Sequence, residues 1–238
     1  MSASTLTEPM LGRRERILEA AREIIAERGY EGLTMRDLAV LSRVTVPTLY
    51  NLVGGKDAVL FAAVEEQTER FVRAIESSRG RSPAAGAIAV ADASVRELLR
   101  QPRYYRTLLR LLYTSDAAEP VSREVNRALR EQFADAIDAL DQAGDLAAWI
   151  DRKTLAERLG AHLGLVSLEW AGGTYSAETF RAVALFDAST TLLAVCEGES
   201  RRELQRVATR AQRRAALGRR QKRGRSQSRG GRAAGSRK

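Results

Sequence analysis

Thr34–Asp57 has the sequence TMRDLAVLSRVTVPTLYNLVGGKD, and this stretch decides how the rest of the chain is interpreted. Thr34 stands where a helix N-cap is expected, and Asp37 three residues later completes a pair that resembles a capping box. Ser42 and Arg43 then interrupt the helical pattern and form a turn. From the first short helix we expect Leu38, Ala39 and Leu41 to face inward. The stretch therefore predicts two short helices joined by a tight polar turn.

The second short helix begins near Thr45, whose hydroxyl is suited to an N-cap. Pro47 fits the first helical turn, where its missing N–H costs little. Because Pro47 disfavours a helical conformation of the residue before it, Val46 remains an alternative cap. A helix of about seven residues is not stable alone in water, so it must be braced by its neighbours.

The preceding segment, roughly Gly12–Arg28, provides such a brace. Its apolar residues recur at the spacing of one helix face, and Gly29 follows as a helix-ending glycine. The apolar residues of this face are Ile17, Ala20, Ala21, Ile24 and Ile25. Three helices in this order predict a helix-turn-helix, whose second helix enters the major groove of DNA with its N-terminal residues near the base edges. By pattern alone, an ordinary αα-hairpin in a helical protein remains open.

If the second short helix lies in a groove, its outward side chains must suit bases and phosphates. These side chains would be Thr45, Val46, Thr48, Tyr50 and Asn51. Val46 and the methyl group of Thr48 suit thymine methyls, while hydroxyls and the Asn51 amide can bond bases or phosphates. Lys56 stands at the start of the next helix, where its ammonium and the free backbone N–H groups would bind a phosphate.

The residues DLAVLSRVTVPTLYNLVGGKDAVL resemble the DNA-binding domain of tetracycline-repressor-type (TetR-family) transcription regulators. Thr48-Leu49-Tyr50 and Lys56-Asp57 match the family pattern, and the resemblance covers about Arg13–Leu60. Two positions depart from it. Arg43 replaces the usual glycine of the turn, where a left-handed conformation would cost an arginine roughly 1 kcal/mol. Val53 replaces a bulky aromatic residue.

The resemblance extends what the pattern predicts. It implies a homodimer held by the last two helices, a palindromic double-stranded DNA operator and a repressor released by a small-molecule effector. The candidate DNA-binding residues are Thr34, Arg43, Thr45, Val46, Pro47, Thr48, Tyr50, Asn51 and Lys56. The candidate effector-pocket residues are Tyr105, Leu109, Leu112, Tyr113, Phe133, His162, Val166 and Trp170. A plain helical core containing these apolar residues, with His162 as a hydrogen-bonded interior residue, remains open.

Composition favours an all-α fold. Of the 238 residues 44% are hydrophobic and only 5% aromatic, with alanine and leucine dominant. Helical patterns separated by glycine and proline predict about nine helices. We find no 18-residue apolar run, and Met1–Leu11 lacks the features of a secretory signal. The one cysteine, Cys196, excludes an internal disulfide and fits a reducing cytoplasm; we expect it to be a small core residue.

Positive charge is concentrated at the C-terminal end. The whole chain carries a net charge of +9. The segment from Arg201 onward contains 15 basic residues and one acidic residue, so the preceding part has a net charge of −5. The sequence therefore predicts three parts: a helix-turn-helix domain (1–55), a helical effector-binding and dimerisation domain (56–200), and a basic, largely disordered tail (201–238). The tail either has no role or is a polyanion-binding arm.

The sequence gives little support for an enzyme. One cysteine and one histidine cannot supply a structural zinc site, and we expect no cofactor. Gly54-Gly55-Lys56 is not a phosphate-binding P-loop, because Tyr50 and Asp57 occupy its required Gly and Ser/Thr positions. We predict a sequence-specific DNA-binding regulator in the cytoplasm. The alternative is a nucleoid-type or RNA-binding protein that acts through its arginine-rich tail.

Overall fold

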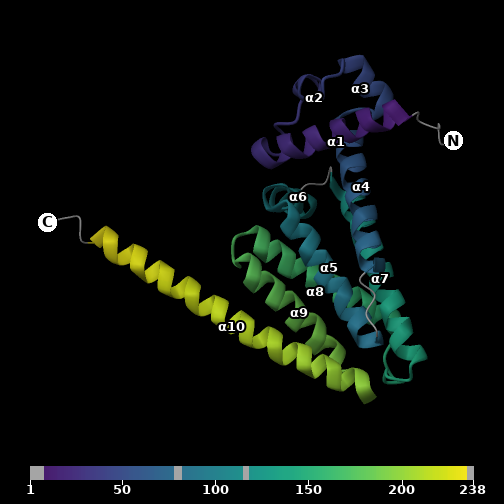
Figure 1. Ribbon diagram of the computed structural model, residues 1–238, viewed down its shortest axis with the longest axis vertical. Coiled ribbons are helices and arrows are strands. Elements are labelled where there is room, and N and C mark those ends of the chain that lie inside the picture. The colour runs from purple at the N-terminus through teal and green to yellow at the C-terminus, as the bar shows by residue number, and fades with distance from the viewer. Residues whose placement is uncertain (1–7, 78–81, 115–117, 235–238) are drawn as a thin grey trace. The chain divides into compact units, whose positions relative to one another are not determined.

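The computed structural model describes residues 8–77, 82–114 and 118–234, and these residues form an all-helical fold (Figure 1). The described parts contain ten helices, one more than predicted, and no strand; a single β-bridge joins Leu146 and Cys196. The helices are α1 (Glu8–Arg28), α2 (Met35–Ser42), α3 (Val46–Leu52), α4 (Lys56–Ser77), α5 (Pro83–Arg100), α6 (Pro102–Thr114), α7 (Glu119–Gln142), α8 (Arg152–Ala171), α9 (Ala177–Leu193) and α10 (Gly198–Ala234). None of the described helices combines the length and apolarity needed to cross a lipid bilayer.

The helices form two compact units. Unit 1 comprises residues 1–73 and 100–128, and unit 2 comprises residues 74–99 and 129–238. This division differs from the predicted domains, because most of α4 together with α6 belongs with the N-terminal helices. The reason is tertiary: α6 packs on α1 although more than 70 residues separate them in the sequence.

In unit 1, α1 supplies the apolar face that the sequence predicted. Ile17, Leu18, Ile24 and Ile25 are fully or almost fully buried. The helix ends at Gly29, which has a positive φ of 74° and donates its N–H to the Ile25 carbonyl. α1 packs against α2, α3 and α6, so it is the common support of the two short helices.

A polar cluster is buried in unit 1 between α1, α4 and α6. Arg22 is only 5% exposed, and its Nη1 lies 3.2 Å from Glu66 Oε2; Glu66 also pairs with Arg70. The Tyr104 hydroxyl is buried and has no hydrogen-bond partner among the described residues. Burial raises the pKa of Tyr104, with the Glu66 carboxylate adding to the rise and Arg22 opposing it. The cluster ties the first helix to α4 through a desolvated ion pair.

Unit 2 is built on aromatic and aliphatic side chains from α7, α8 and α9. Phe133 and Ile137 of α7 are fully buried. Trp170 of α8 stacks on Phe180 of α9, with ring centroids 4.9 Å apart and an interplanar angle of 11°. Such stacking stabilises beyond the apolar area that it buries.

The last helix of the prediction is in fact two helices. We expected one helix to run from about Ser176 past Cys196, but α9 ends at Leu193 and α10 begins at Gly198. Between them the chain pairs with the α7–α8 connection, where Ala147 N–H donates to Val195 O and Glu197 N–H to Asp145 O. Gly198 has a φ of 59°, which only glycine adopts without strain.

Cys196 lies in this connection and is buried, as predicted for a core residue. Burial, together with the nearby Asp145 carboxylate, raises the pKa of its thiol to about 11. A thiol that stays protonated at neutral pH is a poor nucleophile.

The sequence predicts a largely disordered tail from Arg201 onward, and in the structure Arg201 lies within a helix. The segment continues as α10 to Ala234 and packs along α9. Its inward row is apolar at alternating spacings of four and three residues, which is one helix face. This row consists of Leu204, Ala208, Ala211 and Ala215, all buried. The sequence analysis missed this apolar face because it consists mostly of alanines that stand among many arginines.

Candidate nucleic-acid interface

Both short helices of the N-terminal region are capped as the sequence predicted. Thr34 has extended backbone angles, and its Oγ1 accepts a hydrogen bond from the Asp37 N–H at 3.1 Å. Thr45, and not Val46, is the N-cap of α3; its Oγ1 accepts from the Thr48 N–H at 3.3 Å and lies 2.8 Å from Thr48 Oγ1. The caps satisfy N–H groups that the short helices would otherwise leave without partners.

The turn between α2 and α3 is a left-handed one. Arg43 has φ 55° and ψ 46°, and it is the one non-glycine residue with positive φ among the described residues. Its N–H donates to Val40 O, and the Val44 N–H donates to Ala39 O. This hydrogen bonding closes α2 in the manner of a C-terminal cap, with arginine where glycine is favoured.

α2 differs from the prediction on one side. Leu38 and Ala39 are buried, but Leu41 is 51% exposed, so its predicted inward position is wrong. Ser42 is buried instead and donates its hydroxyl hydrogen bond to Leu38 O. A helix of two turns has a narrow inner face. Ser42, four residues after Leu38, lies on this face, whereas Leu41, three residues after Leu38, does not.

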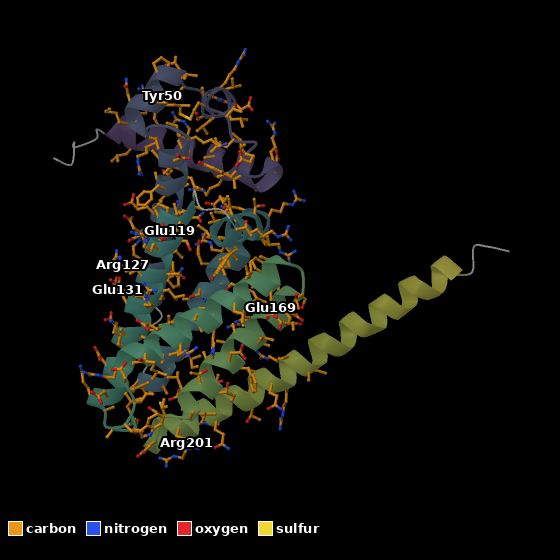
Figure 2. All side chains as sticks on the ribbon, turned by 180° about the vertical axis from the view of Figure 1, so that it is seen from behind. Tyr50, Glu119, Arg127, Glu131, Glu169 and Arg201 are labelled. Atoms are coloured by element: carbon orange, nitrogen blue, oxygen red, sulfur yellow. The ribbon has the colours of Figure 1, made fainter. Side chains whose placement is uncertain are left out.

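α3 has a clear inner and outer side. Leu49 is fully buried, which anchors the helix in unit 1. Tyr50 is 54% exposed, and Figure 2 shows it at the outer edge of the short-helix region. Of the other predicted contact residues, Thr45, Pro47 and Asn51 are exposed, and Val46 and Thr48 are partly exposed. The side chains needed for base and phosphate contacts therefore face solvent and not a hydrophobic interior.

Lys56 opens α4, as predicted, but it already has partners. Its Nζ lies 4.4 Å from the centroid of the Tyr30 ring, 3.4 Å from Glu31 O and 3.7 Å from Glu31 Oε2. The Tyr30 hydroxyl donates a hydrogen bond to Asp57. Burial is the main cause that raises the pKa of Tyr30, and the hydrogen bond to Asp57 adds to the rise. Sequence reasoning missed Tyr30 and Glu31, because no local pattern shows that they return to the start of α4.

The comparisons with known proteins agree with this geometry. Residues 17–63 match the family model described as bacterial regulatory proteins, tetR family. The chain carries a tetR-family domain over these residues. Its N-terminal region is therefore a DNA-binding helix-turn-helix, and the αα-hairpin alternative is set aside. No curated protein sequence matches the chain.

Solved TetR-type structures share the fold. A TetR transcription regulator from Haloarcula marismortui is 18% identical with a TM-score of 0.68, covering 79% of this chain and 100% of its own. SmeT, the repressor of the Stenotrophomonas maltophilia multidrug efflux pump SmeDEF, is 22% identical with a TM-score of 0.66, covering 79% and 92%. FadR of Bacillus halodurans, a fatty acid degradation regulator, is 18% identical with a TM-score of 0.65, covering 74% and 94%. At these identities the likeness concerns the fold.

The N-terminal region that contains the matched helix-turn-helix has no excess positive charge. Residues 1–55 contain seven arginines and seven acidic residues. Arg22 is buried in the ion pair with Glu66, and Arg28 lies 3.3 Å from Asp37. Among the described residues, Arg36 and Arg43 form no salt bridge and are exposed, which leaves them able to meet phosphates. A region without net charge exerts little long-range attraction on a polyanion.

The predicted effector-pocket residues are divided between the two units. In unit 2, Phe133, His162 and Val166 line a cavity of about 10 Å³, and His162 Nδ1 lies 3.4 Å from Thr191 Oγ1. His162 is exposed, so it is not the interior residue of the alternative interpretation. Trp170 is buried against Phe180. The cavity has room for about one water molecule.

The remaining pocket candidates lie on α6 of unit 1. Tyr105 is buried, Leu109 and Leu112 are partly exposed, and Tyr113 is 45% exposed. Their assignment to an effector site stays a prediction.

Proposed function

We propose that this TetR-family regulator binds a palindromic operator as a homodimer and represses transcription until a small molecule releases it from DNA. The observation that carries the proposal is the outer face of α3. Thr45, Tyr50 and Asn51 are exposed there, while Leu49 fixes the helix from the inside. A recognition helix needs this combination, because base contacts require polar side chains held in fixed positions.

A homodimer would give the operator its symmetry. Two copies related by a twofold axis present two recognition helices to two half-sites of inverted sequence. α8 and α9 are the predicted dimer helices, an expectation that comes from the family resemblance.

Release by an effector requires that a ligand bind two states of the protein with different affinity. The cavity at Phe133, His162 and Val166 is too small for an organic ligand. An effector at this place would therefore stabilise a conformation in which the cavity is larger. SmeT, which shares the fold, is a repressor, and this supports repression as the output here. We place its action in the cytoplasm, where its DNA would be.

Selection of bound fragments from random DNA tests the main proposal. We expect enrichment of an inverted repeat, and a sedimentation mass of two chains for the free protein. Enrichment of no sequence, or of a single half-site by a monomer, would contradict it. Thr48→Ala and Tyr50→Ala should reduce the enrichment, while Val40→Ala, at a more exposed position of α2, should leave it intact.

The effector proposal has its own test. A panel of small apolar and amphipathic compounds is titrated against the protein–operator complex, and Val166→Phe serves as the variant that fills the cavity. We expect at least one compound to release the wild-type protein and to fail with Val166→Phe, although that variant still binds operator. Release of both proteins at equal concentrations would place the effector site elsewhere.

A further inference from the structure

α10 changes character at Gly218. Up to this residue it has a buried apolar row, which ends at Ala215. From residue 219 to 234 the helix contains seven lysines and arginines, no acidic residue and no apolar residue larger than alanine. We call residues 219–234 the basic arm.

The packing partner of α10 ends at the same place. Gly218 lies so close to Thr179 that a Cβ on the glycine would collide with the Thr179 side chain. Thr179 is only two residues from the start of α9 at Ala177, and α9 runs antiparallel to α10. Figure 1 shows α10 of unit 2 continuing beyond α9 towards its C-terminal end. The basic arm therefore extends past its support, by about 24 Å at the usual helical rise.

The composition of the basic arm does not favour a helix. Gly224, Gly230 and Gly231 each disfavour a helix by about 1 kcal/mol relative to alanine. Like charges three and four residues apart add to this cost. An anionic partner would remove the repulsion, since neutralising closely spaced cations stabilises the segment that carries them.

The positive charge of the basic arm indicates which kind of molecule binds it. The DNA-binding region, residues 1–55, has no net charge, and the chain before Arg201 is acidic, so the basic arm and the adjoining part of α10 hold the positive charge of the molecule. The arm lacks the apolar face that an interfacial membrane helix needs. Arginine guanidinium groups bind phosphate oxygens with paired hydrogen bonds and remain charged at all relevant pH values. Because α3 is the proposed recognition helix of the same chain, DNA is the polyanion that we assign to the arm.

We propose that the basic arm binds the phosphate backbone of DNA. This would be a second, sequence-independent contact in addition to the one made by α3. This inference rests on the proposed function in one respect, that double-stranded DNA is the partner. In this arrangement α3 selects the sequence, and the arm supplies affinity through release of counterions.

The experiment compares four proteins, of which three are the full chain, a chain ending at Gly218, and a full chain with all seven cations of the basic arm changed to glutamine. A fourth protein, with the six arginines of the arm changed to lysine, keeps the charge and is the matched control. Affinity for operator DNA and for a scrambled duplex of equal length is measured over a range of salt concentrations. Thermal unfolding of all four checks that the folded part is unchanged.

We expect the truncated and glutamine proteins to lose at least tenfold affinity for both duplexes at low salt, with the ratio between the duplexes unchanged. The slope of log K against log salt should fall by about three to six, since each phosphate contact contributes about 0.9. The lysine control should keep the slope. Unchanged slopes in the truncated and glutamine proteins would overturn the inference.

Two further outcomes are separable. If the full chain does not prefer the operator over the scrambled duplex, the proposed function fails, whatever the slopes are. If duplex RNA of the same length binds the full chain more tightly than DNA, and the preference disappears on truncation, the arm is an RNA-binding segment and the inference is wrong.

Discussion

α3 and the basic arm are both helical, and they differ in almost every other respect. α3 has seven residues without a charged side chain, an N-cap at Thr45 and a fully buried Leu49. The basic arm has sixteen residues, seven of them cationic, and lies beyond the end of α9. α3 is anchored and neutral, whereas the arm is strongly basic and extends past α9.

This difference teaches how the two tasks of DNA binding can be divided within a chain. Hydrogen bonds to base edges depend on direction and distance, so they require a helix held firmly by tertiary packing. Attraction to phosphates depends mainly on charge, and it tolerates a poorly fixed segment. Positive charge on the recognition domain is therefore not needed if another segment supplies it.

The largest effect should come from removing the support of α3. Leu49→Ala deletes a fully buried side chain, and we expect a loss of about 2–5 kcal/mol in the free energy of unfolding. Chemical denaturation measures it. Val40→Ala, at a side chain that is 73% exposed, should change stability by less than about 0.5 kcal/mol. Equal effects of the two substitutions would show that α3 is not braced as described.

Removing the outer side chains of α3 should affect recognition and not stability. We expect Thr48→Ala and Tyr50→Ala each to weaken operator binding by about 1–3 kcal/mol, because a base or phosphate contact is lost. Binding to a scrambled duplex, which depends on the arm, should change little. Titrations at matched salt check this. Loss of affinity for both duplexes to the same extent would remove the distinction between the two regions.

Arg43 gives a substitution with two opposite effects. Arg43→Gly should raise the free energy of unfolding by up to about 1 kcal/mol, since glycine adopts φ 55° without strain. The same change should weaken DNA binding and lower the salt slope by about one, because an exposed cation beside α3 is lost. Unfolding and salt-dependent binding are measured on the same protein. Unchanged binding would remove Arg43 from the interface.

The smallest effect belongs to a single position of the arm. Arg225→Gln should leave thermal unfolding unchanged and should lower the salt slope by about one at most. Ala215→Gln, in the packed part of α10, is the comparison, because a buried alanine cannot be enlarged without cost. If Arg225→Gln destabilised the protein as much as Ala215→Gln does, the arm would be packed in the folded state.

Local signals in the sequence were sufficient where neighbouring residues interact with each other. Thr34, Thr45 and Gly29 were correctly predicted as helix ends, since a cap is decided by a side chain and a backbone group a few residues apart. The left-handed Arg43 stands at the turn position where the family resemblance led us to expect a glycine. The family resemblance of residues 13–60 rests on Thr48-Leu49-Tyr50 and Lys56-Asp57, and the match over residues 17–63 confirms it.

Signals failed where distant segments decide the outcome. Gly198 divides the last helices because the chain there pairs with residues 145–147, and nothing near Gly198 shows this. Leu41 was placed inward by its spacing, although Ser42 takes the inner position.

The sequence by itself determined the caps, the turn and the side chains that α3 can offer to DNA, because those properties are set within a few residues. Only the tertiary structure decided that α10 is folded against α9 and that its support ends at Gly218. An alanine stripe among arginines buries little surface per residue, so its stability depends on a partner surface that becomes visible only when the chain is folded.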